Sequence, residues 1–212
     1  MERESFDLVN GRFHVDGYPD AVKLAQLDGS NRRVMQAAAL ASHVQDLEFA
    51  HSAVARLIQF PDDPPIVRES LWRAAIVAYW KAFDPSSKRF RRPLKPEDIY
   101  AAGLPRDNFE HFKKLRHQVV AHNDGTFDAH SVGAVIGPSE ERKVERVLLI
   151  DATILHLNEG GVNNLRLLIE HAHKWAAERL DRCCDQLADQ LRTQPYESLL
   201  ALPDAAITPP RI

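Results

Sequence analysis

Apolar residues recur at intervals of three and four along much of this chain, the spacing that places them on one face of an α-helix. The first such stretch covers about residues 30–60, and its apolar seam consists of Ala37, Leu40, Val44, Leu47, His51, Val54 and Ile58. The same spacing predicts three further main helices, at about residues 65–83, 107–122 and 158–192. Proline and glycine lie between these stretches, where they end one helix before the next begins.

The pattern changes between the third and fourth of these helices. Residues 131–136 and 144–157 are rich in Val, Ile, Leu and Thr, and Gly137 with Pro138 supplies a turn between them. This composition predicts a β-hairpin at about residues 130–157. Shorter elements are a strand at residues 12–15 and a helix at residues 96–102 that Gly103 would cap.

Four helices with narrow apolar seams need one another to bury those seams. The pattern therefore predicts an all-α fold, a four-helix up-and-down bundle with a small β-hairpin insertion. No linker divides residues 1–192, which we expect to form a single domain. Residues 193–212 contain four prolines, and we expect this C-terminal tail to be loosely packed.

Composition is that of a folded protein, with 44% hydrophobic and 27% charged residues in a chain of 212. No apolar run approaches the roughly 18 residues that span a bilayer, and the first residues lack the apolar region of a secretory signal. We expect a cytoplasmic protein with no membrane association. Cys183 and Cys184 are adjacent in a helical stretch, where they cannot bridge, which excludes a disulfide scaffold.

The formal charge of −3 hides an uneven distribution. Residues 81–122 hold ten Lys and Arg against five acids, so this segment is basic and the remainder is acidic. A polyanion such as RNA would bind there, and the predicted contacts are Lys88, Arg89, Arg91, Arg92 and Lys113. The alternative is a solvated basic loop with no ligand.

Candidate chemistry lies at the end of the third predicted helix, which carries Arg116, His117 and His122. Arg116 and His122 are six residues apart, about 9 Å along a helix axis and about 120° around it, so both can face one groove. A histidine at a helix C-terminus is favoured in its charged form, and apolar neighbours favour the neutral form. Such a ring suits proton transfer, and a nearby arginine suits a phosphate.

This run resembles the signature of the HEPN superfamily: an arginine, a polar residue, four further residues and a histidine near the end of a bundle helix. The match is tight over residues 115–124 and loose over about residues 30–192, and it looks most like the abortive-infection type. Members that work with a nucleotidyltransferase antitoxin often carry a tyrosine two residues after the histidine. Asp124 occupies that position here, so the resemblance does not extend to control by tyrosine modification.

The resemblance implies a metal-independent endoribonuclease with a toxin or phage-defence role and no cofactor. It implies a homodimer whose active site lies at the two-fold interface, with an antitoxin protein as a possible further partner. His122 would transfer protons, Arg116 would hold the phosphate and His117 would orient the substrate, leaving a 2′,3′-cyclic phosphate and a 5′-hydroxyl. The alternative function is a non-catalytic helical dimer that binds RNA or a protein through the same basic cleft.

Several residues also have purely structural interpretations. His122 could cap its helix while Arg116 pairs with an acid such as Asp107 or Glu110. His51 is expected to be a core histidine, and a metal site at residues 170–173 is not expected because histidines two apart on a helix point to different faces. The aromatic residues of the second helix are expected in a packed core or a dimer face; they are Trp72, Tyr79, Trp80 and Phe83.

Overall fold

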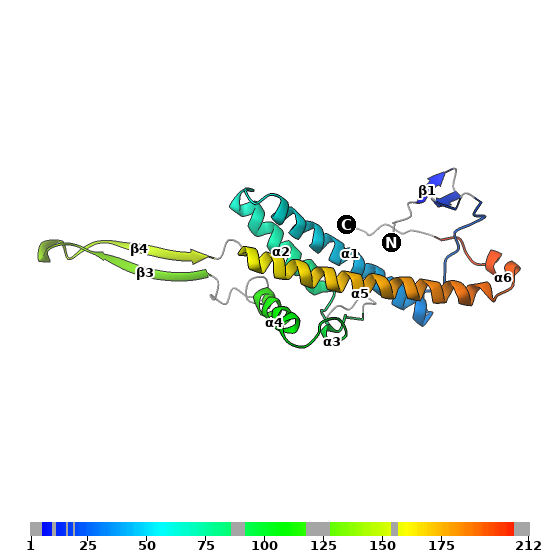
Figure 1. The fold of residues 1–212 in the computed structure, drawn as a ribbon. Coiled ribbons are helices and arrows are strands. Elements are labelled where there is room, and N and C mark those ends of the chain that lie inside the picture. The colour runs from blue at the N-terminus through cyan, green and yellow to red at the C-terminus, as the bar shows by residue number, and fades with distance from the viewer. Residues whose placement is uncertain are drawn as a thin grey trace. The chain divides into compact units, whose positions relative to one another are not determined.

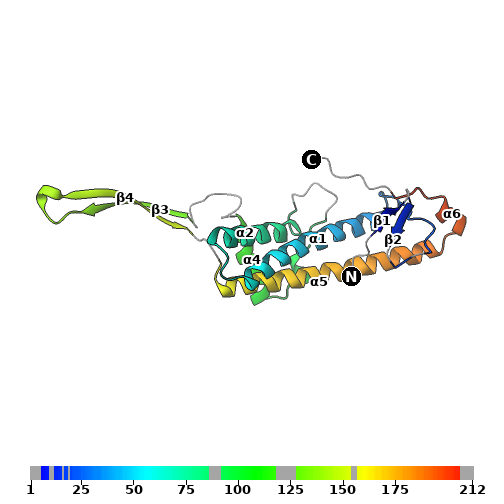
Figure 2. The ribbon, with the colours of Figure 1, turned by 90° about the horizontal axis from the view of Figure 1, so that it is seen from above.

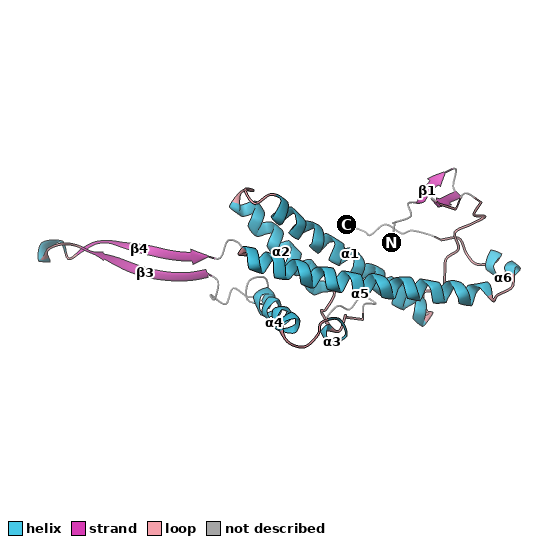
Figure 3. Ribbon diagram, in the orientation of Figure 1, coloured by secondary structure: helices cyan, strands magenta, loops and turns pink. Residues whose placement is uncertain are grey.

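The fold is mostly helical, with antiparallel strand pairs in addition (Figures 1 and 3). The computed structural model describes residues 6–9, 12–15, 17–18, 20–85, 92–117, 128–153 and 157–205. The chain divides into two compact units. The first unit comprises residues 1–42, 88–92 and 176–212, and the second comprises residues 43–87 and 93–175.

Three of the predicted main helices are confirmed with ends within two residues of the expected ones: α1 (Arg32–Gln59), α2 (Pro65–Lys81) and α5 (Glu159–Arg192). Asn31 begins α1 by accepting a hydrogen bond from the Arg33 N–H at 2.8 Å. Pro65 stands in the first turn of α2, where its missing N–H costs nothing.

The helix that carries the candidate chemistry begins earlier than predicted. α4 spans Leu104–Arg116, and the shorter α3 spans Pro96–Ile99. Gly103 does not end α3 but precedes α4, with φ of 90°, a conformation that favours glycine. Asp107, which the sequence predicts as the N-cap, lies instead in the first turn of α4, and its N–H donates to the Gly103 carbonyl at 2.9 Å.

The predicted seam of α1 is confirmed at Leu40, Val44, Leu47 and Val54 and is wrong at His51 and Ile58. Leu40, Val44 and Leu47 are buried, but the side chain of His51 is 47% exposed. A strict seven-residue repeat drifts by about 20° per heptad around a straight helix. The buried face near the C-terminal end of α1 therefore passes through Ala50, Val54 and Leu57 rather than through His51 and Ile58. The fully buried histidine is His43.

The predicted hairpin is confirmed. β3 (Asp128–Ile136) pairs antiparallel with β4 (Val144–Thr153), and the short 3-10 helix η2 (Glu140–Arg142) lies in the connection. A Cβ at Gly137 would stand 1.7 Å from the Arg142 carbonyl oxygen, so this turn accepts only glycine. A second antiparallel pair joins β1 (Phe6–Val9) to β2 (Arg12–Val15), the strand that the sequence predicts.

The core of the second unit is built on the aromatic face of α2. Figures 1 and 2 show α2 alongside the parts of α1 and α5 in this unit, and α2 also contacts α4. Trp72, Ile76, Tyr79 and Phe109 are each no more than 1% exposed. The aromatic residues of α2 therefore pack within the chain itself and leave no aromatic face for a partner to cover, contrary to one of the two expectations for them.

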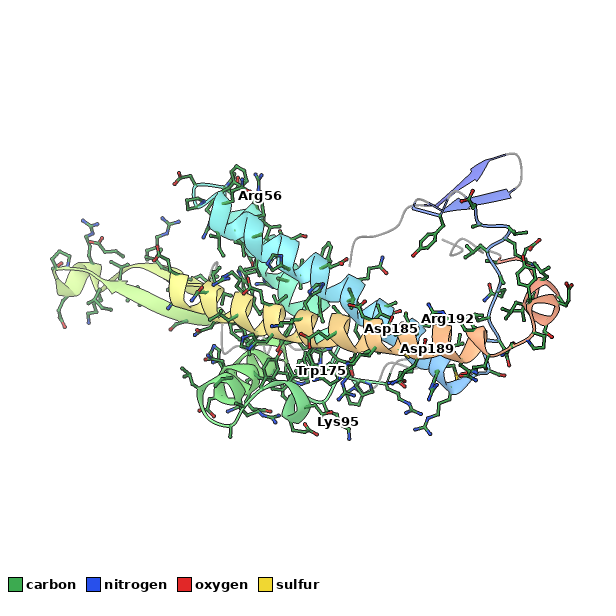
Figure 4. All side chains as sticks on the ribbon, turned by 45° about the vertical axis from the view of Figure 1, so that its right-hand side comes forward. Arg56, Lys95, Trp175, Asp185, Asp189 and Arg192 are labelled. Carbon is green, nitrogen blue, oxygen red and sulfur yellow. The ribbon has the colours of Figure 1, made fainter. Side chains whose placement is uncertain are left out.

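The apolar seam predicted for α5, from Val162 to Leu191, is confirmed from Val162 to Leu187, whereas Leu191 is partly exposed. Val162, Leu165, Ile169, Ala172, Ala176, Leu180, Cys183 and Leu187 are all buried. Cys183 is a free thiol that lies 3.5 Å from the Arg33 carbonyl oxygen, and Cys184 is exposed and also free. The last turns of α5 carry an exposed ion pair between Asp189 and Arg192 at 2.6 Å (Figure 4).

The described part of the C-terminal tail has no buried residue but makes contacts with the chain before α1. Residues 193–205 include α6 (Tyr196–Leu200) and reach back to the residues before α1. The Lys23 ammonium donates to the Leu200 carbonyl at 3.1 Å and pairs with Asp204 at 3.1 Å, and Ala25 forms a β-bridge with Asp204. No helix in the described ranges combines the length and the apolar character needed to cross a bilayer.

Candidate functional site

The candidate site begins with the face that α4 turns outward. Phe109, Phe112 and Leu115 are buried and hold α4 against the core of the second unit. That burial leaves Lys113 and Arg116 at the rim, and His117 follows directly as the exposed C-cap residue. Positive charge in the last turn of a helix is favoured by the helix dipole, so the local structure supports a cationic group at this end.

Arg116 and His117 gather around one indole. The Arg116 guanidinium carbon lies 5.9 Å from the centre of the Trp80 ring, and the His117 ring lies 5.9 Å from it in an edge-on arrangement. The Arg116 Nη1 and His117 Nδ1 atoms are 3.5 Å apart, at the limit of a hydrogen bond. These contacts orient two predicted site residues, Arg116 and His117, toward the same place.

Behind the two cations stands an aromatic wall. Trp80 stacks on Phe109 with ring centres 5.7 Å apart and an interplanar angle of 29°. Phe83 packs edge-on against Phe109 with centres 5.0 Å apart. Since all three side chains are 8% exposed or less, they form a fixed surface rather than a mobile one.

A pocket of about 530 Å³ opens between this wall and the cations. Ten residues line the pocket: Trp80, Phe83, Asp84, Pro85, Pro96, Phe109, Glu110, Lys113, Arg116 and His117. Lys113 is one of the predicted RNA contacts, and its ammonium pairs with Glu110 at 3.4 Å. We call this feature the α4 pocket.

Among the described residues, Arg116 forms an ion pair with neither of the two acids named for its structural alternative. The α4 pocket contains Glu110, but Glu110 pairs with Lys113, and no ion pair within the described ranges joins Arg116 to Glu110 or to Asp107. The guanidinium lies over an indole, and an aromatic face attracts a cation without accepting hydrogen bonds in the manner of a carboxylate.

The remaining predicted site residues fall in two groups. His122, Lys88, Arg89 and Arg91 lie outside the described residues. Arg92 is exposed and belongs to the first unit. Of the predicted catalytic residues, Arg116 and His117 are therefore the two that the described geometry brings together.

A second polar cluster was not expected from the sequence. The His51 Nε2 atom lies 3.5 Å from a carboxylate oxygen of Glu170, and the His173 Nε2 atom lies 3.7 Å from one of Glu48. These four residues and Ser52 line a cavity of about 260 Å³ between α1 and α5 in the second unit. The prediction of His51 as a core histidine is wrong, because this half-exposed ring forms part of an interhelical pair.

The signal for this cluster was present in the sequence. Each helix carries a glutamate followed three residues later by a histidine: Glu48 and His51 on α1, and Glu170 and His173 on α5. Residues three apart share one face of a helix. His171 and His173 are two apart and point to different faces, so only His173 shares a face with Glu170. No three His, Cys, Asp or Glu side chains in the described parts of the chain are grouped so as to hold a metal ion.

Comparison with known proteins adds no relative: no protein-family model, no curated protein and no solved structure matches this chain.

Proposed function

We propose that this protein is a metal-independent endoribonuclease of HEPN type whose site is formed by Arg116, His117 and His122. The observation that carries the proposal is the meeting of Arg116 and His117 at the rim of the α4 pocket, at the end of a helix whose other face is buried. The family resemblance supplies the third residue, His122, and the reaction.

The chemistry asked of these residues is transesterification within the RNA. The 2′-oxygen forms a bond to the neighbouring phosphorus while the bond from phosphorus to the 5′-oxygen breaks. One proton leaves the 2′-hydroxyl for a base, and one proton reaches the departing 5′-oxygen, so a 2′,3′-cyclic phosphate and a 5′-hydroxyl result. We assign proton transfer to His122 and orientation of the substrate to His117.

Arg116 would stabilise the charge that builds up on the phosphate during attack. Its guanidinium presents several N–H donors in a plane and stays protonated at any physiological pH, which suits a phosphate oxygen pair. The contact with the Trp80 ring holds this guanidinium in one region at the pocket rim. Positioning before the reaction reduces the reorganisation that the transition state requires.

The proposal includes the assembly and the setting that the resemblance implies. We propose that α1, α2, α4 and α5 form an up-and-down four-helix bundle and that two copies bring two motifs together at a two-fold axis. One His122 could then act as base and the other as acid. A toxin or phage-defence role in the cytoplasm, with an antitoxin protein as a partner, completes the proposal.

The test compares RNA cleavage by the wild-type chain with cleavage by Arg116→Ala, His117→Ala and His122→Ala. Arg106→Ala is the matched control, because Arg106 is an arginine on the same helix that pairs with Glu97 at 3.8 Å outside the α4 pocket. We expect Arg116→Ala and His122→Ala to lose cleavage, Arg106→Ala to keep it, and the products to carry 2′,3′-cyclic phosphate ends.

Two results would overturn the proposal. Full cleavage by both Arg116→Ala and His122→Ala would remove these residues from the reaction. RNA binding by the wild-type chain without cleavage, together with normal growth of cells that express it, would assign the site to the non-catalytic alternative. Sedimentation of each variant checks that the oligomeric state is unchanged.

A further inference from the structure

We infer that the α4 pocket binds the base of a nucleotide whose phosphate lies at Arg116, and that Glu110 makes guanine the preferred base. This inference rests on the proposed function for its substrate class, RNA. It adds a specificity-determining residue, Glu110, that the proposed reaction does not involve.

The size of the pocket suits this ligand. Its volume of about 530 Å³ falls within the range of roughly 300–1,000 Å³ that small-molecule sites occupy. A phosphate alone would need no such depth, because an exposed arginine and lysine can hold it. The space behind Arg116 therefore calls for a larger, planar group attached to the phosphate.

The wall of the pocket suits a base. Trp80, Phe83 and Phe109 line the pocket, with Trp80 the most exposed of the three at 8%, and the more open Pro85 and Pro96 add flat apolar surface. Aromatic side chains stack bases with a gain that does not depend on which base is bound. Because the Trp80 and Phe109 rings already stack on each other, the wall keeps its shape whether or not a base is present.

The charged residues of the pocket indicate where the phosphate and the base of a nucleotide would lie. Arg116 and His117 stand together against Trp80, and Lys113 lies one turn before them on α4. This cationic side would hold the phosphate. Glu110 also lines the pocket, and its side chain is 45% exposed, so its carboxylate remains accessible although it pairs with Lys113.

A carboxylate can select among bases because it has no hydrogen-bond donor. An ionised carboxylate accepts hydrogen bonds and donates none. Guanine presents a ring N–H and an amino group side by side on its Watson–Crick edge, which match the two oxygens of one carboxylate. Adenine and cytosine place an acceptor beside their amino group, and uracil places acceptors on both sides of its ring N–H. Glu110 therefore favours guanine over the other three bases.

The binding experiment uses the His122→Ala chain, which cannot cleave if the proposed function is correct, and calorimetric titration with GMP, AMP, CMP and UMP. We expect GMP to bind at least about tenfold more tightly than the others, the discrimination that a bidentate contact gives. Glu110→Gln should bring GMP to the level of AMP, and Glu178→Gln, which alters an exposed glutamate of α5 in the first unit, should change nothing.

Two further variants separate the parts of the inference. Trp80→Phe should weaken all four nucleotides by a similar factor, because stacking does not distinguish bases. Glu110→Asp keeps the carboxylate and should retain a preference for GMP. This variant tests the role of the carboxylate even if Glu110→Gln alters folding. Equal binding of the four nucleotides, or competition by inorganic phosphate as strong as that by GMP, would overturn the inference.

The source of the base is tested with oligonucleotides. A pentanucleotide with one central G should bind more tightly than GMP and more tightly than a pentamer of A, because flanking phosphates add contacts to Lys113 and Arg116. Tighter binding of free GMP than of the G-containing pentamer would overturn RNA as the source. The outcome is independent of cleavage, so a failed cleavage test and a failed binding test remain distinguishable.

Discussion

The hydroxyl of Tyr79 on α2 and the hydroxyl of Tyr100, which follows α3, lie 2.7 Å apart in the buried core of the second unit. Tyr100 also donates its proton to the Leu168 carbonyl of α5 at 2.9 Å. Because a phenol has one proton, Tyr79 is the donor in the pair. Two side chains thus join α2, the end of α3 and α5. Both tyrosine rings also pack against Phe83 and Phe109, which belong to the aromatic wall of the α4 pocket.

Replacing Tyr100 by Phe should destabilise the protein by about 1–3 kcal/mol, because the Tyr79 hydroxyl and the Leu168 carbonyl lose their partner in a buried place. Urea denaturation measures this change in the free energy of unfolding. Tyr196→Phe is the control, since Tyr196 is 61% exposed and its hydroxyl can bond to water after any change. Equal stability of Tyr100→Phe and the wild-type chain would contradict the buried pair.

The same pair predicts a loss of stability at alkaline pH. Burial raises the pKa of Tyr79 well above its ordinary value and also raises the pKa of Tyr100, while the hydrogen bond from Tyr79 partly opposes the shift of Tyr100. Above about pH 10 the unfolded chain releases protons that the folded chain keeps. Stability then falls as pH rises, by about 1.4 kcal/mol per pH unit for each phenol.

Urea denaturation at a series of pH values between 8 and about 11.5 checks this prediction. The free energy of unfolding should change little between pH 8 and 9 and fall steeply above pH 10. The Tyr100→Phe variant should show a shallower fall, because one of the two phenols is gone. A parallel fall in the variant and the wild-type chain would show that other groups control alkaline unfolding.

Lys113 is predicted to contact a phosphate of bound RNA. Lys113→Ala should reduce the slope of log K against log salt concentration by about one, because one fewer counterion is released. Fluorescence anisotropy of a labelled RNA between 50 and about 200 mM salt measures this slope. Lys143→Ala, which alters an exposed lysine beside Glu140 at the tip of the hairpin, should leave the slope unchanged.

Cys184 should react slowly with alkylating reagents although it is exposed. Partial burial raises the pKa of its thiol, and Cys183, Asp181 and Asp185 raise it further. The reactive thiolate is therefore scarce at neutral pH. Asp185→Asn removes one neighbouring negative charge and should speed alkylation at pH 7.5, as mass spectrometry of the modified chain would show.

The alkylation rates should be compared in a Cys183→Ala background, so that Cys184 is the one thiol whose modification is measured. Asp189→Asn is a suitable control, because Asp189 belongs to the ion pair with Arg192 rather than to the surroundings of Cys184. An equal rate for Asp185→Asn and its parent would contradict the electrostatic effect of Asp185.

The helices of this protein could be predicted from sequence because most of their burial follows a simple period. α5 spans 34 residues, and the residues of its predicted seam from Val162 to Leu187 are buried as expected, while Leu191 near the helix end is partly exposed. The period fails on α1, where drift around the helix moves the buried face from His51 to Ala50. The spacing of apolar residues predicts that a helix has a buried face. Which of two adjacent lines of residues along the helix is buried depends on where the neighbouring helices pack.

The candidate site shows a similar division. The position of Arg116 and His117 near the end of a helix followed from the motif spacing. The aromatic wall did not, because the helical spacing of Trp80 is the same for a residue in the core and for one that lines a pocket. Trp80 lines the pocket because α2 packs against α4, and these contacts join residues about thirty positions apart in the sequence.

The two glutamate–histidine pairs between α1 and α5 have a consequence for how these helices align. Glu48 faces His173 and His51 faces Glu170, so each helix offers the same two groups and the partners exchange roles. A slide of one helix by a single turn would separate both pairs at once and bring Glu170 toward Leu47 or Ala55. Apolar seams of similar side chains tolerate such a slide better than these pairs do, so the two glutamate–histidine pairs favour the observed alignment of α1 and α5 within the second unit.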